Sequence, residues 1–322
     1  MELEVRHLRA LCAVADAGSV RKAARALGVT QPSLTAQLQR IENALGGELF
    51  LRGPEGTRLT LLGRSVLCRA RSIVSDMSAL LDEVAAATNR EHGGRLRIGC
   101  TSSRVVAGWL RRLRARLPET DTTIRVDVSA NALLQMVAGG QLDVAFVHEV
   151  EGAPLRVPDG LATRELVHRE PQFVALAESH PAARRSVVEL TDLVADEWMV
   201  DSTVDGEWVG LRRVFATAGL NPRFVHGDYT TAADLVAAGV VVTPCQPTTH
   251  PRPGMAIRPL AGDPLAVRLF MAHRTSPEQV LAAHSYSGLF ADLRASYREV
   301  AERSAAYRQW LGRHDLPLPV AG

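Results

Sequence analysis

The sequence SVRKAARALGVTQPSLTAQLQRIENALGG, which covers residues 19–47, decides the N-terminal fold. Ser19 and Thr30 are preferred helix N-caps, and each stands directly before a stretch with apolar residues at helical spacing. Gly28 and Gly46 allow a turn at the end of each of these helices. Another helix, predicted from Arg6 to Ala17, precedes them. Two helices that are joined by a glycine-containing turn and braced by a third are typical of a helix-turn-helix.

The outward face of the helix after Thr30 carries short polar, amide and guanidinium side chains. The opposite face has an apolar stripe, which runs from Leu34 to Leu45. Groups of these types bind base edges and phosphates, although the same face could also be the solvated surface of a small helical bundle. We predict that it reads DNA, through Gln31, Pro32, Ser33, Thr35, Ala36, Gln39 and Arg40.

Residues 50–60 predict a short hairpin after this helix. The turn-rich segment GPEGT separates Phe50-Leu51-Arg52 from Arg58-Leu59-Thr60, so that each arm carries one arginine. Taken alone, a surface loop with two solvated arginines explains the segment better. Next to a helix-turn-helix, it predicts a DNA-binding wing in which Arg52 and Arg58 contact the phosphate backbone.

The positive charge lies in the N-terminal part of the chain. The 322 residues contain 37 Lys and Arg and 35 Asp and Glu, which gives a formal charge of +2. Residues 1–71 hold 11 of these cations and 6 of these anions, so their charge is +5, and residues 72–322 carry −3. A basic N-terminal segment joined to a mildly acidic remainder fits a DNA-binding head on a larger domain.

A heptad pattern follows the hairpin. From Thr60 the apolar residues recur at alternating spacings of four and three, which predicts a long helix over 61–89 with one apolar seam. The seam could pack against the rest of the same chain, but the other faces of the helix are polar, which favours packing against a partner helix. A dimeric DNA-binding protein also suits a palindromic site. We expect a hinge at 90–94 and dimerisation through Val66, Ala70, Ile73, Met77, Leu80 and Val84.

The order of these residues resembles that of the LysR-type transcriptional regulators. The resemblance rests on Ala23-Ala24-Arg25-Ala26-Leu27, Thr30-Gln31-Pro32-Ser33-Leu34-Thr35, Leu45-Gly46, Leu49-Phe50 and Leu59-Thr60, and further along on Ser179-His180-Pro181 and Leu235-Val236-Ala237-Ala238-Gly239. The chain departs from the family pattern at Val20, where an aromatic residue is common, and at Val241, where a second glycine is usual. The resemblance implies a homodimer or homotetramer that binds double-stranded operator DNA, contacts RNA polymerase and responds to a small-molecule effector.

The C-terminal part predicts two α/β lobes independently of this resemblance. Strand and helix patterns alternate over 95–148 and again from Phe173 to Leu269, and a final helix is predicted from Pro277 to Leu311. The expected fold is therefore an N-terminal all-α winged helix-turn-helix with a long linker helix, followed by an α/β effector domain of two Rossmann-like lobes, similar to type 2 periplasmic binding proteins. The expected boundaries are 1–60 for the DNA-binding domain, 61–89 and 90–94 for linker and hinge, 95–165 with 269–312 for the first lobe, 166–268 for the second, and 313–322 for a tail.

Hydroxyl-rich segments at the ends of predicted strands mark a candidate effector site. Ligands of open α/β sheets bind beyond the carboxyl ends of the strands, where hydroxyls and free backbone amides converge. Ordinary helix capping explains such segments equally well, and a histidine between apolar residues is more often structural. With that alternative open, we predict effector contacts from Thr101, Ser102, Ser103, His148, Asp201, Ser202, Thr203, Tyr229 and Thr230.

Several other classes of protein are disfavoured. No apolar run approaches the ~20 residues that span a bilayer, and the first residues lack the regions of a signal peptide, so we expect a cytoplasmic protein. The four cysteines form no CxxC pair and the ten histidines form no HExxH or HxH cluster, so neither a disulfide nor a metal site is expected. GxSxG and GxGxxG motifs are absent, and the SxxK match at 19–22 lacks its partners, so we expect neither enzyme activity nor a cofactor.

Two alternatives to an effector-responsive regulator remain. In a thiol redox sensor of the same architecture, Cys100 and Cys245 would come together across the effector domain. A solute-binding receptor would also have two α/β lobes around a cleft, but it requires an export signal and no DNA-binding head.

Overall fold

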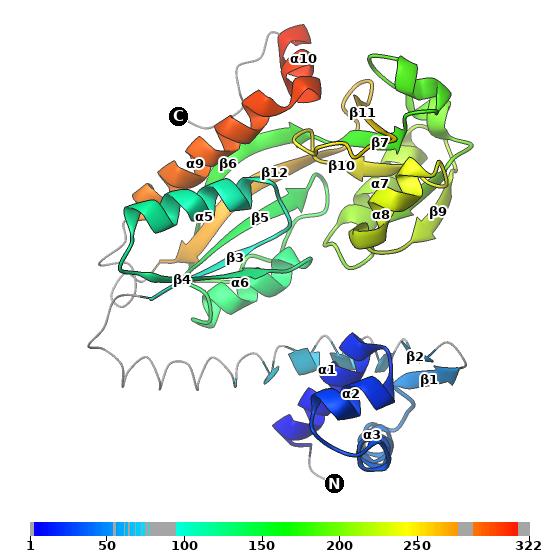
Figure 1. Ribbon diagram of the computed structural model, residues 1–322, viewed down its shortest axis with the longest axis vertical. Helices are drawn as coiled ribbons and strands as arrows, with labels where there is room; N and C mark the ends of the chain where they lie inside the picture. The colour runs from blue at the N-terminus through cyan, green and yellow to red at the C-terminus, as the bar shows by residue number, and fades with distance from the viewer. Residues whose placement is uncertain are drawn as a thin grey trace. The chain divides into compact units, whose positions relative to one another are not determined.

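The computed structural model describes residues 3–53, 56–60, 62–63, 65–67, 69–71, 73–74, 77, 95–275 and 286–314 (Figure 1). The chain divides into two compact units, Met1–His92 and Gly93–Gly322. Each unit has its own hydrophobic core, and each is described by itself below. No helix in the described ranges is both long enough and apolar enough to cross a membrane.

Three helices form the N-terminal unit: α1 (Val5–Ala17), α2 (Val20–Ala26) and α3 (Gln31–Leu45). The predicted caps are confirmed, because Ser19 Oγ accepts from the Lys22 amide at 3.5 Å and Thr30 Oγ1 accepts from the Ser33 amide at 3.4 Å. Glycines in the left-handed region end α1 and α3. The core between the helices is apolar and includes the fully buried Leu11, Val14, Leu34, Leu38 and Ile41.

The predicted hairpin is confirmed as β1 (Phe50–Gly53) and β2 (Gly56–Leu59), which pair antiparallel. Two contacts fasten it to the helices. The Thr57 amide donates to Gly18 O at 3.0 Å, and Glu42 Oε1 on α3 accepts from the amides of Leu49 and Phe50 at 2.8 and 3.2 Å. The wing is therefore held at a fixed place beside the end of α1 and the last turns of α3.

The chain after the wing turns back onto the N-terminal core. Thr60 Oγ1 accepts from the Gly63 amide at 2.9 Å, so Thr60 caps the helical turn that follows it. Gly63 is buried, and a Cβ there would lie 2.0 Å from Leu49 O, so only glycine fits this approach of two backbones.

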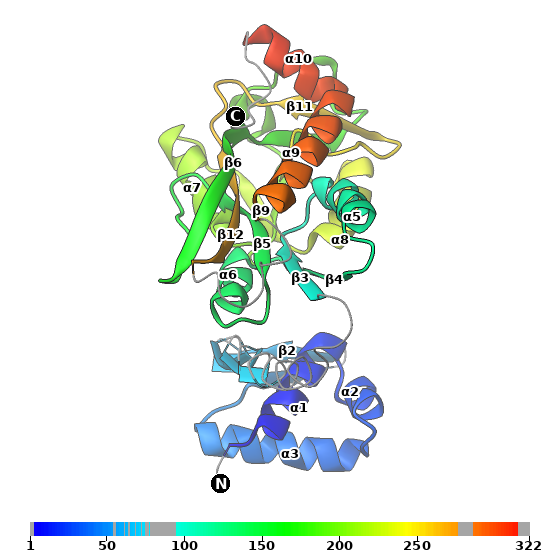
Figure 2. The same ribbon diagram turned by 90° about the vertical axis from the view of Figure 1, so that its left-hand side faces the viewer.

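The first lobe of the second unit is built on a five-stranded sheet with the order β4-β3-β5-β12-β6 (Figure 1). The expected parallel strands are confirmed as β3 (Arg95–Cys100), β4 (Asp121–Val126) and β5 (Val144–Val150), connected through α5 (Val105–Arg116) and α6 (Ala130–Ala138). Two long antiparallel strands, β6 (Leu161–Pro171) and β12 (Ala266–Arg274), complete the sheet. Helices α5 and α9 cover one face and α6 covers the other (Figures 1 and 2).

The second lobe has a smaller sheet, in which β7 (Phe173–Ala177) lies between β10 (Thr243–Cys245) and β11 (Met255–Pro259). The parallel pair β8 (Glu197–Val200) and β9 (Arg223–His226) joins it through the bridge between Trp198 and Val242. Two helices belong to this lobe, α7 (Glu207–Thr217) and α8 (Tyr229–Ala237), together with two 3-10 turns, η1 (Pro181–Arg184) and η2 (Leu190–Leu193). Val241, where the family has a glycine, is 3% exposed and packs in the core.

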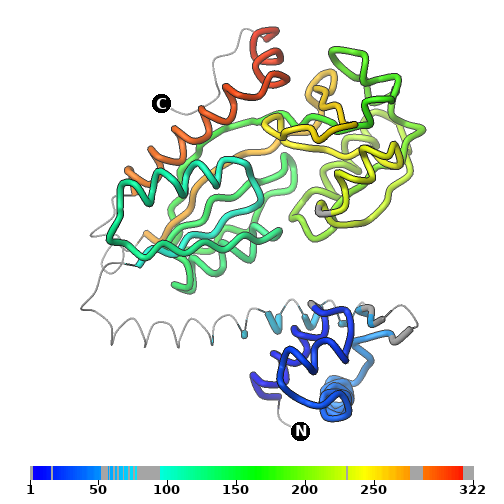
Figure 3. The backbone as a smooth tube through the Cα atoms, in the orientation of Figure 1, coloured from blue at the N-terminus to red at the C-terminus, as the bar shows by residue number. Residues whose placement is uncertain are grey.

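The chain passes between the lobes at β6 and returns at β12, as the tube in Figure 3 shows. These strands pair with each other along most of their length, so the crossing is a double strand. One hydrophobic cluster runs through both lobes and contains Trp109 from the first and Trp198 from the second.

The final helical segment differs from the prediction. The sequence pattern predicts one helix from Pro277 to Leu311, whereas the structure has α9 (Tyr286–Arg303) and α10 (Ala305–Arg313), and residues 276–285 lie outside the described ranges. Ser304 separates the two helices, since its Oγ accepts from the Tyr307 amide at 3.3 Å and donates to Pro247 O at 2.7 Å. The prediction of a single helix is wrong because serine tolerates a helix interior, and only this tertiary contact reveals it as a cap.

Candidate nucleic-acid interface and inter-lobe cleft

The outward face of α3 is exposed in the way that the sequence predicts. Leu34, Leu38 and Ile41 are buried, and Thr35 is half-buried at the flank of the exposed face. The remaining predicted reading residues are all exposed: Gln31, Pro32, Ser33, Ala36, Gln39 and Arg40. Gln39 and Arg40 thus project from the side of the helix that lies opposite the core, with Gln31 at the flank of this face, which is the arrangement that a recognition helix requires.

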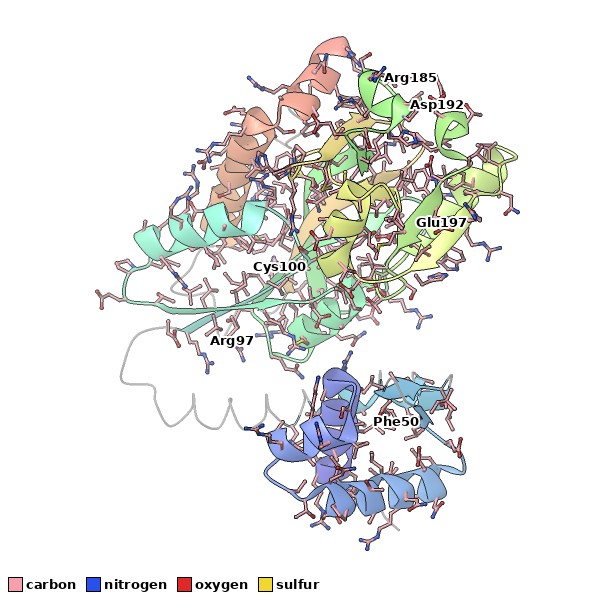
Figure 4. The ribbon with its side chains drawn as sticks, turned by 45° about the vertical axis from the view of Figure 1, so that its right-hand side comes forward. Phe50, Arg97, Cys100, Arg185, Asp192 and Glu197 are labelled. Carbon is pink, nitrogen blue, oxygen red and sulfur yellow. The ribbon has the colours of Figure 1, made fainter. Side chains whose placement is uncertain are left out.

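The wing is held against α3 by residues whose roles the sequence pattern does not predict. Glu42 lies on the last turns of α3 and holds the start of the wing through two backbone amides. Phe50, labelled in Figure 4, is 5% exposed and belongs to the core beneath the wing. A glutamate beside an exposed asparagine gives no sequence signal for this role, because a carboxylate on a helix is most often solvated.

The two wing arginines occupy different strands. Arg52 lies on β1 and pairs with Thr57, and Arg58 lies on β2 and pairs with Leu51. The side chains of both arginines lie outside the described part of the structure.

Part of the heptad seam packs inside the N-terminal unit. Ala70 is buried in its core and Val66 packs against that core, whereas Ile73 is 47% exposed and Met77 is half-buried. Leu80 and Val84 lie outside the described residues. The seam therefore contributes apolar contacts within one chain before it becomes exposed at Ile73.

A cleft of about 660 Å³ lies between the two lobes of the second unit. Both lobes supply its walls, and this volume is within the range of small-molecule sites. Of the nine predicted effector residues, six line it: Thr101, Ser102, Ser103, His148, Asp201 and Tyr229. Ser202 and Thr203 do not line the cleft, and the side chain of Thr230 is not described. The structure thus brings together residues that are more than 100 positions apart in the sequence.

The first-lobe wall contains a partly buried hydrogen-bonded pair. His148 lies within β5, and its Nδ1 is 2.9 Å from the Oγ1 of Thr101, the residue that follows β3. Burial lowers the pKa of His148 to about 4, so the imidazole is neutral near pH 7. From the other lobe, Gln246 Nε2 donates to Ser102 O at 3.5 Å, a long contact that links the two walls directly. Thr101, Ser102 and His148 thus present neutral hydrogen-bonding groups to a ligand, and Arg104 adds a positive charge on the same wall.

The second-lobe wall is acidic. The Asp201 amide donates to Glu207 Oε1 at 3.2 Å, and the Tyr229 hydroxyl donates to the same oxygen. Burial raises the pKa of Glu207 to about 7, and hydrogen bonds from Tyr229 and Asp201 act in the opposite direction. Thr203 donates its amide and its hydroxyl to Asp201 Oδ1 at 2.9 and 2.5 Å, so it positions a cleft residue from outside the cleft.

Seven further polar residues line the cleft without having been predicted: Arg104, Gln172, Glu207, Asp228, Thr243, Gln246 and Thr249. Gln172 is 8% exposed, and its Nε2 has no hydrogen-bond partner among the described residues. It directly follows β6, the long strand that sequence reasoning did not identify. Residues at such a crossing cannot be assigned to a site before the strand pairing is known.

The two cysteines of the redox alternative are both desolvated. Cys100 is fully buried at the end of β3 (Figure 4), and Cys245 lies on β10 and lines the cleft. Burial raises the pKa of each thiol to about 12, which disfavours the thiolate that redox chemistry requires. Cys12, Cys100 and Cys245 form no disulfide within the described ranges, and Cys68 lies outside them.

Both units match known sequence families. A family model described as a bacterial regulatory helix-turn-helix protein of the lysR family matches residues 5–64, and one described as the LysR substrate binding domain matches residues 89–293. The chain belongs to the LysR family. It is therefore a transcriptional regulator that combines a DNA-binding helix-turn-helix with a substrate-binding domain, as the sequence resemblance predicts.

Similar proteins cover this LysR-family chain over its whole length. A small neutral protease regulatory protein of Streptomyces coelicolor is 59% identical over 322 residues, which cover 99% of this chain and 100% of that protein. A protein of the same description from Streptomyces lividans is 57% identical over 327 residues, covering 100% and 91%.

Solved structures show the same fold at lower identity. An OxyR mutant of Corynebacterium glutamicum is 22% identical with a TM-score of 0.54, covering 99% of this chain and 96% of that one. Full-length CbnR complexed with target DNA is 23% identical with a TM-score of 0.50, covering 93% and 100%. At these identities the likeness concerns the fold alone.

Proposed function

We propose that this LysR-family regulator binds operator DNA as a homo-oligomer and responds to a small polar effector in the inter-lobe cleft. The observation that carries the DNA-reading part is the exposed face of α3, which presents Gln39 and Arg40 with Gln31 at its flank, on a helix anchored by a buried apolar stripe. The basic charge of residues 1–71 supports phosphate contact by the same unit.

The cleft supports effector binding because its polar groups come from both lobes. The segment Thr101–Ser103 and His148 belong to the first lobe, and Asp201, Glu207 and Tyr229 belong to the second. A ligand that contacts both walls favours the arrangement of lobes in which those contacts form. In an oligomer this preference changes the spacing of the DNA-binding heads, and with it DNA bending and contact with RNA polymerase.

The relatives suggest a target. Two Streptomyces proteins named as small neutral protease regulatory proteins are 57% and 59% identical to this chain over nearly all of its length. We infer that the genes that this chain controls include one for a small neutral protease.

This proposal is tested by binding of the full chain to the promoter region of such a protease gene from the same genome. We expect a mobility shift that survives excess unrelated DNA, with a steep loss of affinity at higher salt. If an equal mass of unrelated DNA abolishes this binding, the proposed target is refuted.

Oligomerisation through the seam has a separate test. Ile73 is exposed, so Ile73→Asp should weaken the self-association of the full chain in sedimentation velocity without unfolding the N-terminal core. Val66→Asp is the contrasting variant, because Val66 packs on that core and its replacement should destabilise the unit itself. An Ile73→Asp protein that sediments like the wild type would contradict the proposed interface.

A further inference from the structure

A second cavity, of about 980 Å³, lies beside the inter-lobe cleft in the same unit. Its walls come from both lobes: α5 and the corner between α9 and α10 from the first, and η1, β11 and residues 248–251 from the second. Three residues line both spaces, Arg104, Thr249 and Met255. The two cavities are therefore neighbours that share part of a wall.

Arginine dominates the charge of this cavity. Two carboxylates line it, Glu178 and Glu299, together with His250 and six arginines: Arg104, Arg111, Arg184, Arg185, Arg258 and Arg303. Glu299 already binds Arg303 at 2.7 Å, Arg112 at 3.3 Å and Arg111 at 3.4 Å. Because this one carboxylate pairs with three guanidinium groups, the wall of the cavity keeps a net positive charge.

Other cavity arginines have no carboxylate partner. Arg258 is held by backbone carbonyls: its Nε donates to Ala183 O and Arg185 O at 2.9 Å, and its Nη1 donates to Ile257 O at 2.8 Å. Within the described residues, no ion pair involves Arg104, Arg184 or Arg258. By contrast Arg185 binds Asp192 at 2.7 Å, a pair that lies at one corner of the second lobe in Figure 4. An anion in the cavity would thus meet guanidinium groups that are not yet neutralised.

The corner at Ser304 adds backbone donors to the same wall. Ser304, Ala305 and Ala306 line the cavity, and they form the N-terminus of α10. The Ser304 side chain satisfies the Tyr307 amide, but the first amides of a helix have no acceptor within it, and the helix dipole places partial positive charge at this end. The positive end of a helix and several arginines therefore line one open cavity.

We propose that this arginine cavity is a second ligand site, which binds a phosphorylated small molecule with at least two negative charges. Guanidinium groups bind phosphate oxygens in bidentate fashion, and helix N-termini bind the same groups. The volume lies at the upper end of the range for small-molecule pockets, which suits a ligand larger than a free phosphate ion. Since both lobes line the cavity, its occupation also changes effector affinity in the adjoining cleft, a coupling that rests on the proposed effector function and is reciprocal.

The binding claim is tested with pyrophosphate as the probe and the full chain as the protein. Pyrophosphate is titrated into the protein in a calorimeter, and potassium chloride is adjusted to keep the ionic strength constant. Under these conditions, specific binding is distinguished from general charge screening. We expect saturable binding by the wild type that weakens about tenfold or more in the double variant Arg184→Ala/Arg303→Ala. The matched control Arg114→Ala/Arg298→Ala removes two exposed arginines from the same unit outside the cavity and should bind like the wild type.

A second pair of variants leaves the arginines in place. Ala305 is exposed at the first position of α10, where a carboxylate is favourable for the helix, so Ala305→Glu should fold normally yet repel the anion. Ala305→Gln has nearly the same shape without the charge and should keep binding. The proposal is overturned if pyrophosphate shows no saturable binding, if both arginine pairs weaken it equally, or if Ala305→Glu binds as well as Ala305→Gln. Loss of pyrophosphate binding with normal operator binding would leave the DNA-binding function intact, so the two proposals fail separately.

Discussion

Glu170 offers a quantitative test of how a buried carboxyl group makes the stability of the second unit depend on pH. It lies on β6 near the crossing between the lobes, is 1% exposed, and pairs with Val267 of β12. Its Oε1 accepts from the Tyr297 hydroxyl at 2.5 Å, the Tyr297 and Tyr307 hydroxyls are 3.1 Å apart, and its Oε2 has no partner among the described residues. Burial raises the pKa of Glu170 to about 7, and the hydrogen bond from Tyr297 only partly offsets this effect.

Because the pKa of Glu170 differs between the folded and the unfolded chain, the free energy of unfolding depends on pH. The folded protein keeps the Glu170 proton up to about pH 7, whereas the unfolded chain releases it near pH 4.5, so the free energy of unfolding falls as the pH rises through this window. The difference between these pKa values corresponds to at most about 3 kcal/mol. Glu170→Gln removes the titration, so the variant should be more stable than the wild type at pH 8 by up to this amount, and closely similar at pH 5.

Urea unfolding followed by tryptophan fluorescence measures this directly. All four tryptophans, Trp109, Trp198, Trp208 and Trp310, lie in the second unit, so the signal reports its unfolding alone. Glu165→Gln is the control, since it removes a carboxylate from the same strand at a site that is 36% exposed. A stability difference between pH 5 and pH 8 that persists unchanged in Glu170→Gln would refute the reasoning.

Three other changes have defined outcomes. Gly63→Ala should destabilise the N-terminal unit by about 1–3 kcal/mol in calorimetry, because the new Cβ meets the Leu49 carbonyl, whereas Gly312→Ala, with open space around it, should be neutral or stabilising. Glu42→Ala should cost about 2 kcal/mol by freeing two amides of the wing, and it should weaken operator binding more than Glu48→Ala, a change at an exposed glutamate; equal effects would argue against the wing anchor. Tyr229→Phe removes the hydroxyl that donates to Glu207 and should lower effector affinity without changing operator affinity in effector-free mobility shifts.

Local sequence signals predicted the N-terminal unit well. Ser19, Thr30 and Thr60 are caps in the structure, and the buried stripe of α3 follows the helical period. Such signals act over three or four residues, so they can be read directly from the sequence.

In the second unit, several features depend on long-range contacts that local sequence signals do not predict. The pairing of β12 between β5 and β6 joins residues that are 95 to 129 positions apart, and no local pattern specifies it. The same holds for Gln172 and Gln246, which reach the cleft through strand pairing, and for Ser304, whose partner Pro247 lies on another segment. Five of the six predicted residues that line the cleft follow strands or begin helices, the positions where fold topology alone places a ligand, whereas His148 lies within β5.

The central claim is that α3 selects the DNA sequence that this regulator binds. Selection of genomic fragments by the full chain, with Gln39→Ala and Gln31→Ala compared against the wild type, tests it most directly. We predict that the wild type enriches an inverted repeat, and that each variant loses preference at particular base positions while it keeps its affinity for DNA in general. Enrichment of the same repeat with unchanged base preference by both variants would contradict the claim.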